Sequence, residues 1–240
     1  MPTHIFFDLD NTLTPSRSVM LSEHQTLFAR LCAVCDVIVV SGSSESVIRK
    51  DIPTPQKGFF ILAQSGNHAE DKSGVVLWQE TFTPEQKNLI LTFIKDIHDA
   101  AKLTVSHEDD LVEDRGSQIS YSMIGHNEDR AKKKAFDPNA AKRLSFLAER
   151  TTQRDTLRAA GVEVMVGGTT CFDFYVAGKH KGFNITRLIE REKWNKDDCM
   201  YVGDALFSGG NDEAVIGVIA TRAVSNPHET FEYIQTLLTP

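Results

Sequence analysis

The first 66 residues alternate between short apolar runs and longer stretches in which apolar residues recur at helical spacing. Residues 4–8, 36–42 and 59–66 contain continuous apolar runs with the length of buried strands. Between these runs, a helix is predicted from Ser22 to about Ala33, where Ser22 and Gln25 have the spacing of a capping box, and another near residues 44–51. Strand, helix, strand, helix and strand in this order indicate a parallel, doubly wound sheet.

The pattern changes in the middle of the chain. A hairpin is predicted around GVVLWQE, which follows a DKSG turn, and a helix from Thr83-Pro84 to about Lys102. Residues 117–124 alternate polar and apolar side chains, as a half-exposed antiparallel strand does, and VEVMVGG and CFDFYVAG alternate around a GGTT turn. A further helical region, interrupted near Thr151, is predicted between Asp137 and Gly161. These elements indicate an α+β module.

The parallel pattern returns at Lys181, with a helix to about Lys193, a strand at 200–204, a short helix after Asn211, a strand at 218–224 and a helix from Asn226-Pro227. The sequence therefore predicts an α/β fold with a Rossmann-like doubly wound parallel core of residues 1–81 and 180–240. An α+β cap domain of residues 82–179 is expected as an insertion in this core.

Composition and charge narrow the class of partner. The chain has 240 residues, 41% hydrophobic and 25% charged, with a formal net charge of −7. This charge argues against nucleic acid or an anionic membrane as the main partner, but not against a small anionic metabolite. The N-terminus lacks the basic segment of a signal peptide, and no apolar run reaches the length of a membrane span. We therefore expect a cytoplasmic protein; monomer and homodimer both remain open.

Four cysteines in a chain of this size do not make a disulfide framework. Cys32 and Cys35 form a C-x-x-C, but no second such pair is present to complete a zinc site. Because they fall within an apolar helical pattern, we expect buried core thiols rather than a redox site.

Acidic residues follow two of the predicted parallel strands. Asp8 and Asp10 come at the end of the first strand, and Asp204, Asn211 and Asp212 follow the strand at 200–204. Asn211 is a candidate substrate contact. If these strands are neighbours, Asp8, Asp10, Asp204 and Asp212 converge on one crevice, where their repulsion requires a cation. All-oxygen ligation favours Mg²⁺. Asp8 is placed to attack phosphorus as a nucleophile, and Asp10 to act as general acid and base.

Two further motifs complete this hypothesis. Ser41-Gly42, after the second strand, offers a hydroxyl and free backbone N–H groups to phosphate oxygens. Lys181 opens a helix at the return to the core, where its charge could neutralise a phosphoryl group and the nucleophile. Taken singly, these features are also typical of an ordinary turn and a solvated surface lysine. They carry weight only as a set.

In order along the chain, D-x-D-x-T, strand-Ser-Gly, Lys-Gly at a helix start and strand-GD…GGND resemble the haloacid dehalogenase-like superfamily of phosphotransferases. The resemblance implies a nucleophilic Asp8, an acid/base Asp10, and Mg²⁺ as cofactor with Asp204 and Asp212 in its shell. It also implies that Ser41 and Lys181 hold the phosphoryl group, and that the insertion is a cap of type IIB.

Within that superfamily, four segments are similar to eukaryotic-type phosphomannomutases: TLTPSR, EDRGSQISYSMIGH, VGGTTCFDFYVAG and GDALFSGGND. The resemblance implies substrate contacts for Arg17, Arg115 and Asp173. For Arg115 and Asp173, a structural ion pair or exposed cap charges is the alternative. His126 stands where that family has an arginine that binds the distal phosphate, and Cys171 where it has a sugar-binding serine. A mutase must hold a bisphosphorylated intermediate at both ends, so these changes favour plain hydrolysis.

The leading hypothesis is a Mg²⁺-dependent phosphatase of a small phosphorylated metabolite, such as a sugar phosphate, that works through an aspartyl-phosphate. A phosphomannomutase or other phosphohexomutase is the alternative enzyme. A catalytically silent relative that acts as a binding protein is the alternative from another class.

Overall fold

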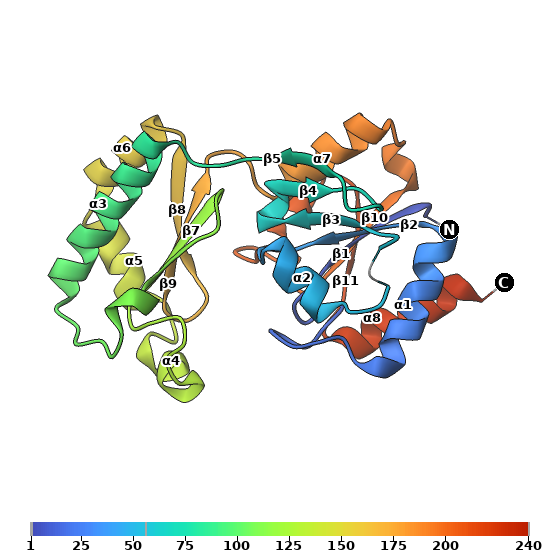
Figure 1. Ribbon diagram of the computed structural model, residues 1–240, viewed down its shortest axis with the longest axis horizontal. Helices are drawn as coiled ribbons and strands as arrows, with labels where there is room; N and C mark the ends of the chain where they lie inside the picture. Colours follow the sequence, from blue (N-terminus) through green and yellow to red (C-terminus); the bar gives the residue numbers. More distant parts are fainter. Residues whose placement is uncertain (1, 56, 240) are drawn as a thin grey trace. The chain divides into compact units, whose positions relative to one another are not determined.

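The computed structural model of the chain describes residues 2–55 and 57–239 and divides into two compact units. The first unit contains the residues up to Gln79 and those from Gly178 onward, and the second contains Glu80–Ala177. The domain boundaries expected after residues 81 and 179 each lie two residues C-terminal to these boundaries. Figure 1 shows the helices and strands of both units.

The first unit is built on a seven-stranded sheet in the order β11-β10-β1-β2-β3-β4-β5. Its first five strands run parallel, and β4 and β5 add an antiparallel edge. The strands are β1 (His4–Asp8), β2 (Asp36–Val40), β3 (Phe60–Ala63), β4 (His68–Glu70), β5 (Val76–Gln79), β10 (Cys199–Gly203) and β11 (Ala220–Ala223). Both neighbours of β1 lie parallel to it, so β1 is at the centre of the parallel part.

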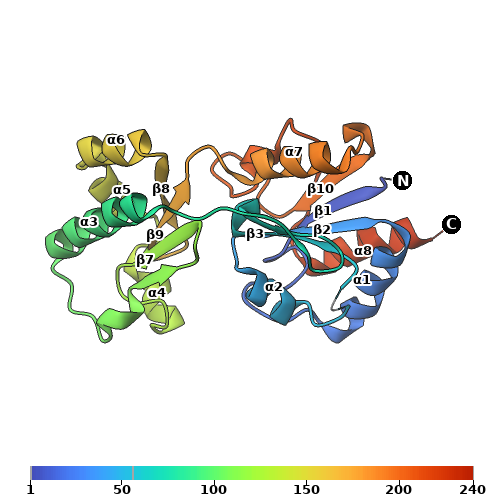
Figure 2. The same ribbon diagram turned by 45° about the horizontal axis from the view of Figure 1, so that its top comes forward.

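Helices cover both faces of this sheet. They are α1 (Ser22–Val34), α2 (Glu45–Asp51), α7 (Lys181–Glu192) and α8 (Pro227–Leu238). Apolar residues of α1, α2 and α8 form one buried cluster with alternate residues of β1 and β2, such as Phe7 and Val39. Residues of α7 form a second cluster with the intervening strand residues, such as Phe6 and Ile38. The predicted doubly wound α/β fold is therefore confirmed (Figure 2).

The second unit is an α+β module. Its antiparallel sheet has the order β6-β7-β9-β8, with β6 (Val112–Asp114), β7 (Gln118–Ser122), β8 (Val162–Gly167) and β9 (Cys171–Val176). Its helices are α3 (Pro84–Ala101), α4 (Arg130–Phe136), α5 (Ala141–Ala148) and α6 (Thr151–Ala159). One face of the sheet, including Phe172 and Phe174, packs on α3 and its neighbours in a separate apolar core. Short 3-10 helices in the two units span Gln64–Gly66, Glu108–Asp110, Lys196–Asp198 and Glu213–Val215.

Two local predictions were wrong, and one helix was missed. The first helix has no capping box, because Leu21 is its N-cap residue and no side chain caps it. Strand β7 is buried on both faces rather than half-exposed. Helix α4 was not predicted, since its sequence RAKKKAF has no apolar stripe; Asp129 caps it by accepting hydrogen bonds from two backbone N–H groups.

The thiols of Cys32 and Cys35 are half-buried against the core rather than fully buried. Burial nevertheless raises the pKa of Cys32 to about 12 and that of Cys35 to about 11, so both thiols stay protonated near neutral pH. Among the helices of the described residues, none is long and apolar enough to cross a membrane.

Candidate active site

The acidic residues lie where two neighbouring parallel strands end. Asp8 is the last residue of β1, Asp204 directly follows β10, and Asp212 lies at the end of the loop after β10. Strand β1 is hydrogen-bonded to β10 on one side and to β2 on the other, and the chain order reverses direction there. Such a switch point is where open α/β sheets bind ligands.

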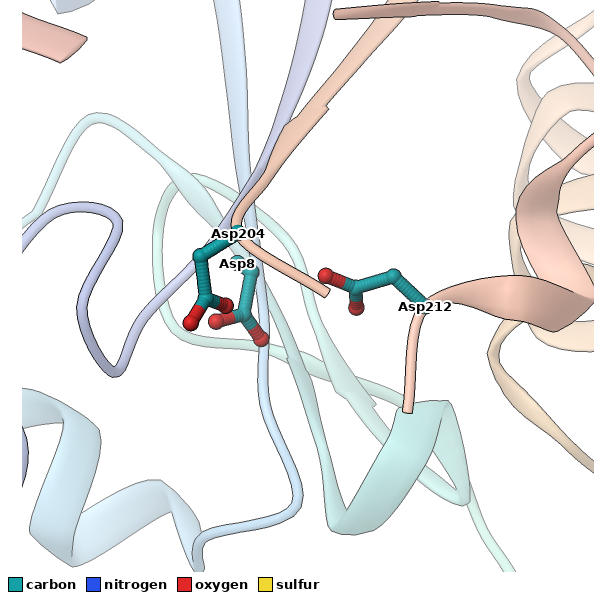
Figure 3. Close-up of side chains that lie close together, drawn as sticks. All are labelled: Asp8, Asp204 and Asp212. Atoms are coloured by element: carbon teal, nitrogen blue, oxygen red, sulfur yellow. The ribbon is translucent and has the colours of Figure 1, made fainter. Parts of the chain in front are cut away.

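Three of the four predicted carboxylates form one group. Asp8, Asp204 and Asp212 each offer an oxygen within 4.8 Å of the others, and Figure 3 shows Asp212 facing the adjacent side chains of Asp8 and Asp204. Among the described residues, the fourth predicted carboxylate, Asp10, is not part of this group. Its Oδ1 accepts a hydrogen bond of 2.7 Å from the backbone N–H of Arg17, which draws the carboxylate toward the turn after β1.

Lys181 lies next to two of these carboxylates, Asp8 and Asp212. It is the first residue of α7 and is buried, and its Nζ donates to Asp8 Oδ1 at 2.6 Å and to Asp212 Oδ1 at 2.7 Å. A buried ammonium flanked by two buried carboxylates offsets part of their repulsion. Although burial alone would lower it, the pKa of Lys181 is raised to about 12 because Asp8 and Asp212 stabilise the charged form.

Two residues of this site were missed in the sequence. The hydroxyl of Tyr201, a fully buried residue of β10, donates to Asp212 Oδ1 at 2.6 Å and accepts from Lys181 Nζ at 3.4 Å. Asn11 donates to Asp204 Oδ2 at 3.3 Å. The signal for Tyr201 was a tyrosine inside an otherwise apolar strand, since a buried phenol needs a hydrogen-bond partner.

Burial has the largest influence on the pKa of Asp8, the candidate nucleophile. Burial raises the pKa of Asp8 to about 7, with Asp212 adding to the shift and Lys181 opposing it. Burial likewise raises the pKa of the half-buried Asp204, while its hydrogen bond from Asn11 opposes this. A cation placed among these carboxylates would favour their ionised forms.

The donor set fits Mg²⁺. Asp8 Oδ2 is buried and has no hydrogen-bond partner in the part of the chain that the structure describes, although Asp8 Oδ1 is held by Lys181. A buried carboxylate oxygen without a donor is costly, and a cation ligand satisfies it. Three carboxylates with hard oxygen atoms suit Mg²⁺, which keeps several waters in its shell. Asp8, Asp204 and Asp212 are the residues that could hold it.

Ser41 and Gly42 follow β2, the other neighbour of β1. The Ser41 Oγ accepts a hydrogen bond of 3.0 Å from the backbone N–H of Ser43, which fixes the turn. Ser41 is buried, and a side chain added at Gly42 would meet nothing within 4 Å. Arg17 and Asn211, the remaining predicted substrate contacts of this unit, are exposed. Arg17 has a left-handed backbone with φ of 53° at the end of the turn that holds Asp10.

Of the predicted cap residues, Cys171 and Asp173 lie on β9, whereas Arg115 follows β6 and His126 lies in the loop after β7. Most of them already have partners. The guanidinium of Arg115 pairs with Glu113, and Asp173 Oδ1 accepts a hydrogen bond of 2.5 Å from Ser120 Oγ. His126 Nε2 lies 3.2 Å from the Ser120 carbonyl oxygen. A Cβ at Gly167 would lie 1.7 Å from Asp173 Oδ2, so a side chain there would displace the Asp173 carboxylate.

His126 and Cys171 influence each other's pKa. Burial lowers the pKa of His126, but the contacts with Cys171, Glu113 and the Ser120 carbonyl outweigh it and raise the pKa overall. Burial raises the pKa of Cys171, but the hydrogen bonds with His126 and Thr170 outweigh it and lower the pKa overall. Of the predicted substrate contacts of the second unit, Arg115 is therefore already paired with a carboxylate. His126 stands where the phosphomannomutase pattern has a second arginine.

Comparisons with known proteins agree with this geometry. The haloacid dehalogenase-like hydrolase family matches residues 5–214. Phosphomannomutase 1 of Dictyostelium discoideum is 23% identical over 98% of this chain and 96% of its own length, and the phosphomannomutase of Schizosaccharomyces pombe is 25% identical over 98% and 94%.

Among solved structures, a haloacid dehalogenase-like hydrolase from Bacteroides thetaiotaomicron superposes with a TM-score of 0.68 at 14% identity, covering 99% of this chain and all of the other. An IMP-nucleotidase of Plasmodium falciparum superposes with a TM-score of 0.67 at 14% identity, over 99% of this chain and 68% of the other. At these identities the superpositions show the fold. The family match covers most of the chain, and the protein is therefore an enzyme that belongs to the haloacid dehalogenase-like hydrolases.

Proposed function

We propose that the protein is a Mg²⁺-dependent phosphatase of a small phosphorylated metabolite, a sugar monophosphate, and that it works through an aspartyl-phosphate on Asp8. The observation that carries this proposal is the asymmetry of the Asp8 carboxylate. Its Oδ1 is held at 2.6 Å by Lys181, whereas its Oδ2 is buried without a partner among the described residues. One oxygen is thus oriented by a fixed charge and the other is left for a ligand.

The chemistry would proceed in two displacements at phosphorus. In the first, an oxygen of Asp8 forms a bond to phosphorus while the bond to the ester oxygen breaks, and Asp10 donates a proton to that leaving oxygen. In the second, Asp10 takes a proton from water as its oxygen attacks phosphorus, and the bond to Asp8 breaks to release phosphate. The hydrogen bond from the Arg17 backbone orients Asp10 for both proton transfers.

Charge compensation comes from groups around Asp8. Lys181 offsets negative charge on Asp8 and Asp212, and the Ser41 hydroxyl with the Gly42 backbone would bind phosphoryl oxygens. When bound, Mg²⁺ supplies a positive charge that offsets the phosphoryl oxygens, and Asp8, Asp204 and Asp212 would hold it.

Hydrolysis rather than isomerisation is favoured by the second unit. A mutase needs strong donors for a second phosphate, and arginine is the side chain best suited to this task. Here the guanidinium of Arg115 is paired with Glu113, and His126 is engaged with Ser120 and Cys171. Asp173 adds negative charge that repels a second phosphate but accepts hydrogen bonds from sugar hydroxyls.

A phosphohexomutase is the second candidate, because the curated relatives named above are phosphomannomutases that match almost the whole chain. In that reaction the phosphoryl group on Asp8 returns to the sugar instead of passing to water.

A phosphate-release screen over hexose and pentose monophosphates, run with and without Mg²⁺ and with and without a hexose 1,6-bisphosphate, tests both candidates. Phosphorus NMR of mannose 1-phosphate separates them. We expect free phosphate with little 6-phosphate. Rapid formation of the 6-phosphate with negligible free phosphate would establish the mutase. No turnover of any ester in the presence of Mg²⁺ would favour a non-catalytic binding protein.

A further inference from the structure

Residues 64–67, which we name the junction loop, have an unusual backbone within the first unit. Gln64, Ser65 and Gly66 all have positive φ, at 52°, 58° and 88°. Left-handed conformations are unfavourable for residues with a side chain, so neighbouring groups must hold this loop in place. Gln64, Gly66 and Asn67 are buried. A strained, buried loop of this kind indicates that its contacts are under a specific geometric requirement.

One set of contacts joins the junction loop to the turn that carries Ser41. The backbone N–H of Ser65 donates to the Ser41 carbonyl oxygen at 2.8 Å, and that of Gln64 donates to the Ser43 carbonyl oxygen at 2.9 Å. Both carbonyls flank Gly42. The orientation of the turn after β2 is therefore tied to the left-handed backbone of the junction loop.

A second set joins the loop to the segment just before Lys181. Asn67 Nδ2 donates to the Lys179 carbonyl oxygen at 3.1 Å. Asn184, on the first turn of α7, donates from Nδ2 to the Lys179 carbonyl at 3.2 Å and to the Ser65 carbonyl at 3.0 Å. Both asparagines are fully buried. A Cβ at Gly66 would lie only 2.4 Å from Asn184 Cβ, so the close approach of α7 requires glycine there.

A third contact joins the loop to the segment that leaves the unit. Trp78 Nε1 donates to the Gly66 carbonyl oxygen at 2.8 Å, and the Arg187 guanidinium lies 4.4 Å from the Trp78 ring centroid. The chain leaves the first unit after Gln79 and returns to it at Gly178. The junction loop thus holds both segments of the first unit that adjoin the connections to the second unit.

We propose that Asn67 and Asn184 are positioning residues: through the junction loop they fix Ser41 and Lys181 relative to each other and anchor the chain at Trp78 and Lys179. With these anchors in place, movement of the connecting segments would not displace Ser41 or Lys181. The catalytic part of this inference rests on the proposed roles of Ser41 and Lys181 in binding phosphate. The anchoring part rests on the hydrogen bonds alone.

The test compares Asn67→Ala and Trp78→Phe with Asn226→Ala as the matched control. Asn226 caps α8 by accepting a hydrogen bond of 3.1 Å from the Glu229 backbone, so its substitution also removes an asparagine hydrogen bond within the same unit. Each full-length variant is examined by hydrogen exchange of peptides covering residues 62–69 and 178–186, and by steady-state kinetics on p-nitrophenyl phosphate. Trp78→Phe keeps an aromatic ring and removes the indole N–H donor together with one ring of the indole, so it serves if Asn67→Ala does not fold.

For Asn67→Ala we expect exchange about tenfold faster in both peptides and kcat about tenfold lower, because small displacements of catalytic groups are costly. Trp78→Phe should speed exchange about threefold in residues 62–69. Asn226→Ala should change only α8.

Unchanged exchange in folded Asn67→Ala, or in Trp78→Phe if only that variant folds, would overturn the anchor. Faster exchange with unchanged kcat and KM would overturn the positioning role. A wild type without phosphatase activity would instead count against the proposed function, and the exchange measurements would still decide the anchor.

Discussion

The polar cluster at the ends of β1 and β10 differs from the polar face of β7 and β9 in how its charges are satisfied. In the first, three carboxylates lie together, one lysine pairs with two of them, and Asp8 Oδ2 has no partner among the described residues. In the second, Arg115 pairs with Glu113 and Asp173 with Ser120. A site with excess negative charge and an unpaired buried oxygen is arranged for a cation and a reacting group. A face whose charges are internally paired is suited to weaker contacts with a neutral part of a substrate.

The comparison predicts that the largest effect follows a change at the unpaired oxygen. Asp8→Asn should abolish turnover, because an amide is a poor nucleophile and a poor Mg²⁺ ligand, and we expect kcat to fall about 10³-fold or more. Circular dichroism should show an intact fold. Beryllofluoride, which mimics the aspartyl-phosphate, should bind wild type only with Mg²⁺. A folded variant that keeps more than about a tenth of the activity would exclude Asp8 as the nucleophile.

Removal of a second carboxylate from the same cluster should act on the metal. Asp204→Ala should raise the Mg²⁺ concentration needed for half-maximal rate by about 10- to 100-fold, and calorimetric titration should show the same loss of affinity. Asp155→Ala, on the exposed surface of α6, provides the control. Unchanged Mg²⁺ dependence of Asp204→Ala would remove this residue from the metal shell.

Tyr201 should matter less, because it touches the cluster only through its hydroxyl. Tyr201→Phe removes the hydrogen bond to Asp212 without a change in packing, and we expect the Mg²⁺ requirement to rise about tenfold. Tyr233→Phe is the control, since the Tyr233 hydroxyl contacts Met200 Sδ on another part of the unit. Equal Mg²⁺ titrations for the two variants would show that the Tyr201 hydroxyl does not orient Asp212.

In the metal-free protein, the ionised form of buried Asp8 should destabilise the folded state. Burial raises its pKa in the folded state to about 7, above its ordinary value of 3.8. Between these pH values the folded state binds more protons than the unfolded state, so the stability contributed by Asp8 falls as pH rises through this window. The Tm of Asp8→Asn minus that of wild type should therefore increase by several degrees from pH 5 to pH 8 in EDTA. A difference that is constant with pH, or that decreases, would contradict the raised pKa.

The smallest effects are expected on the sheet of the second unit. His126→Arg with Cys171→Ser introduces the two side chains of the phosphomannomutase pattern. It should raise the ratio of 6-phosphate to free phosphate formed from mannose 1-phosphate by about threefold to tenfold. Phosphorus NMR with catalytic bisphosphate measures this ratio. His107→Arg with Cys199→Ser makes the same chemical changes elsewhere in the chain. An equal change in this control pair would mean that the effect is not local to the face.

Much of the fold could be predicted because apolar runs and amphipathic stretches have different periods. The order of strands and helices within residues 4–66 and 181–240 predicted the doubly wound sheet. Parallel strands place their carboxyl ends at the same edge of such a sheet. The approach of Asp8 to Asp204 followed from these two facts. The helix start at Thr83-Pro84 was also readable, and the structure confirms it with a capping box between Thr83 and Gln86.

Other features depended on contacts that no pattern along the chain encodes. The spacing of D-x-D does not reveal that the Arg17 backbone donates a hydrogen bond to the Asp10 carboxylate. Tyr201 belongs to an apolar strand in the sequence, and only the packing of α7 brings Lys181 to its hydroxyl. The ion pair between Glu113 on β6 and Arg115, which follows β6, is likewise a side-chain contact that the structure reveals.

The sequence by itself thus determined which residues follow which strand, because hydrophobic periodicity and turn residues act locally. Only the tertiary structure decided which polar atoms are paired and which are left unpaired. The reason is physical: a hydrogen bond depends on tenths of an ångström and on partners more than a hundred residues away, as for Asn67 and Lys179. That precision arises when the two faces of the sheet are packed, and it is what separates the unpaired oxygen of Asp8 from the paired charges of the second unit.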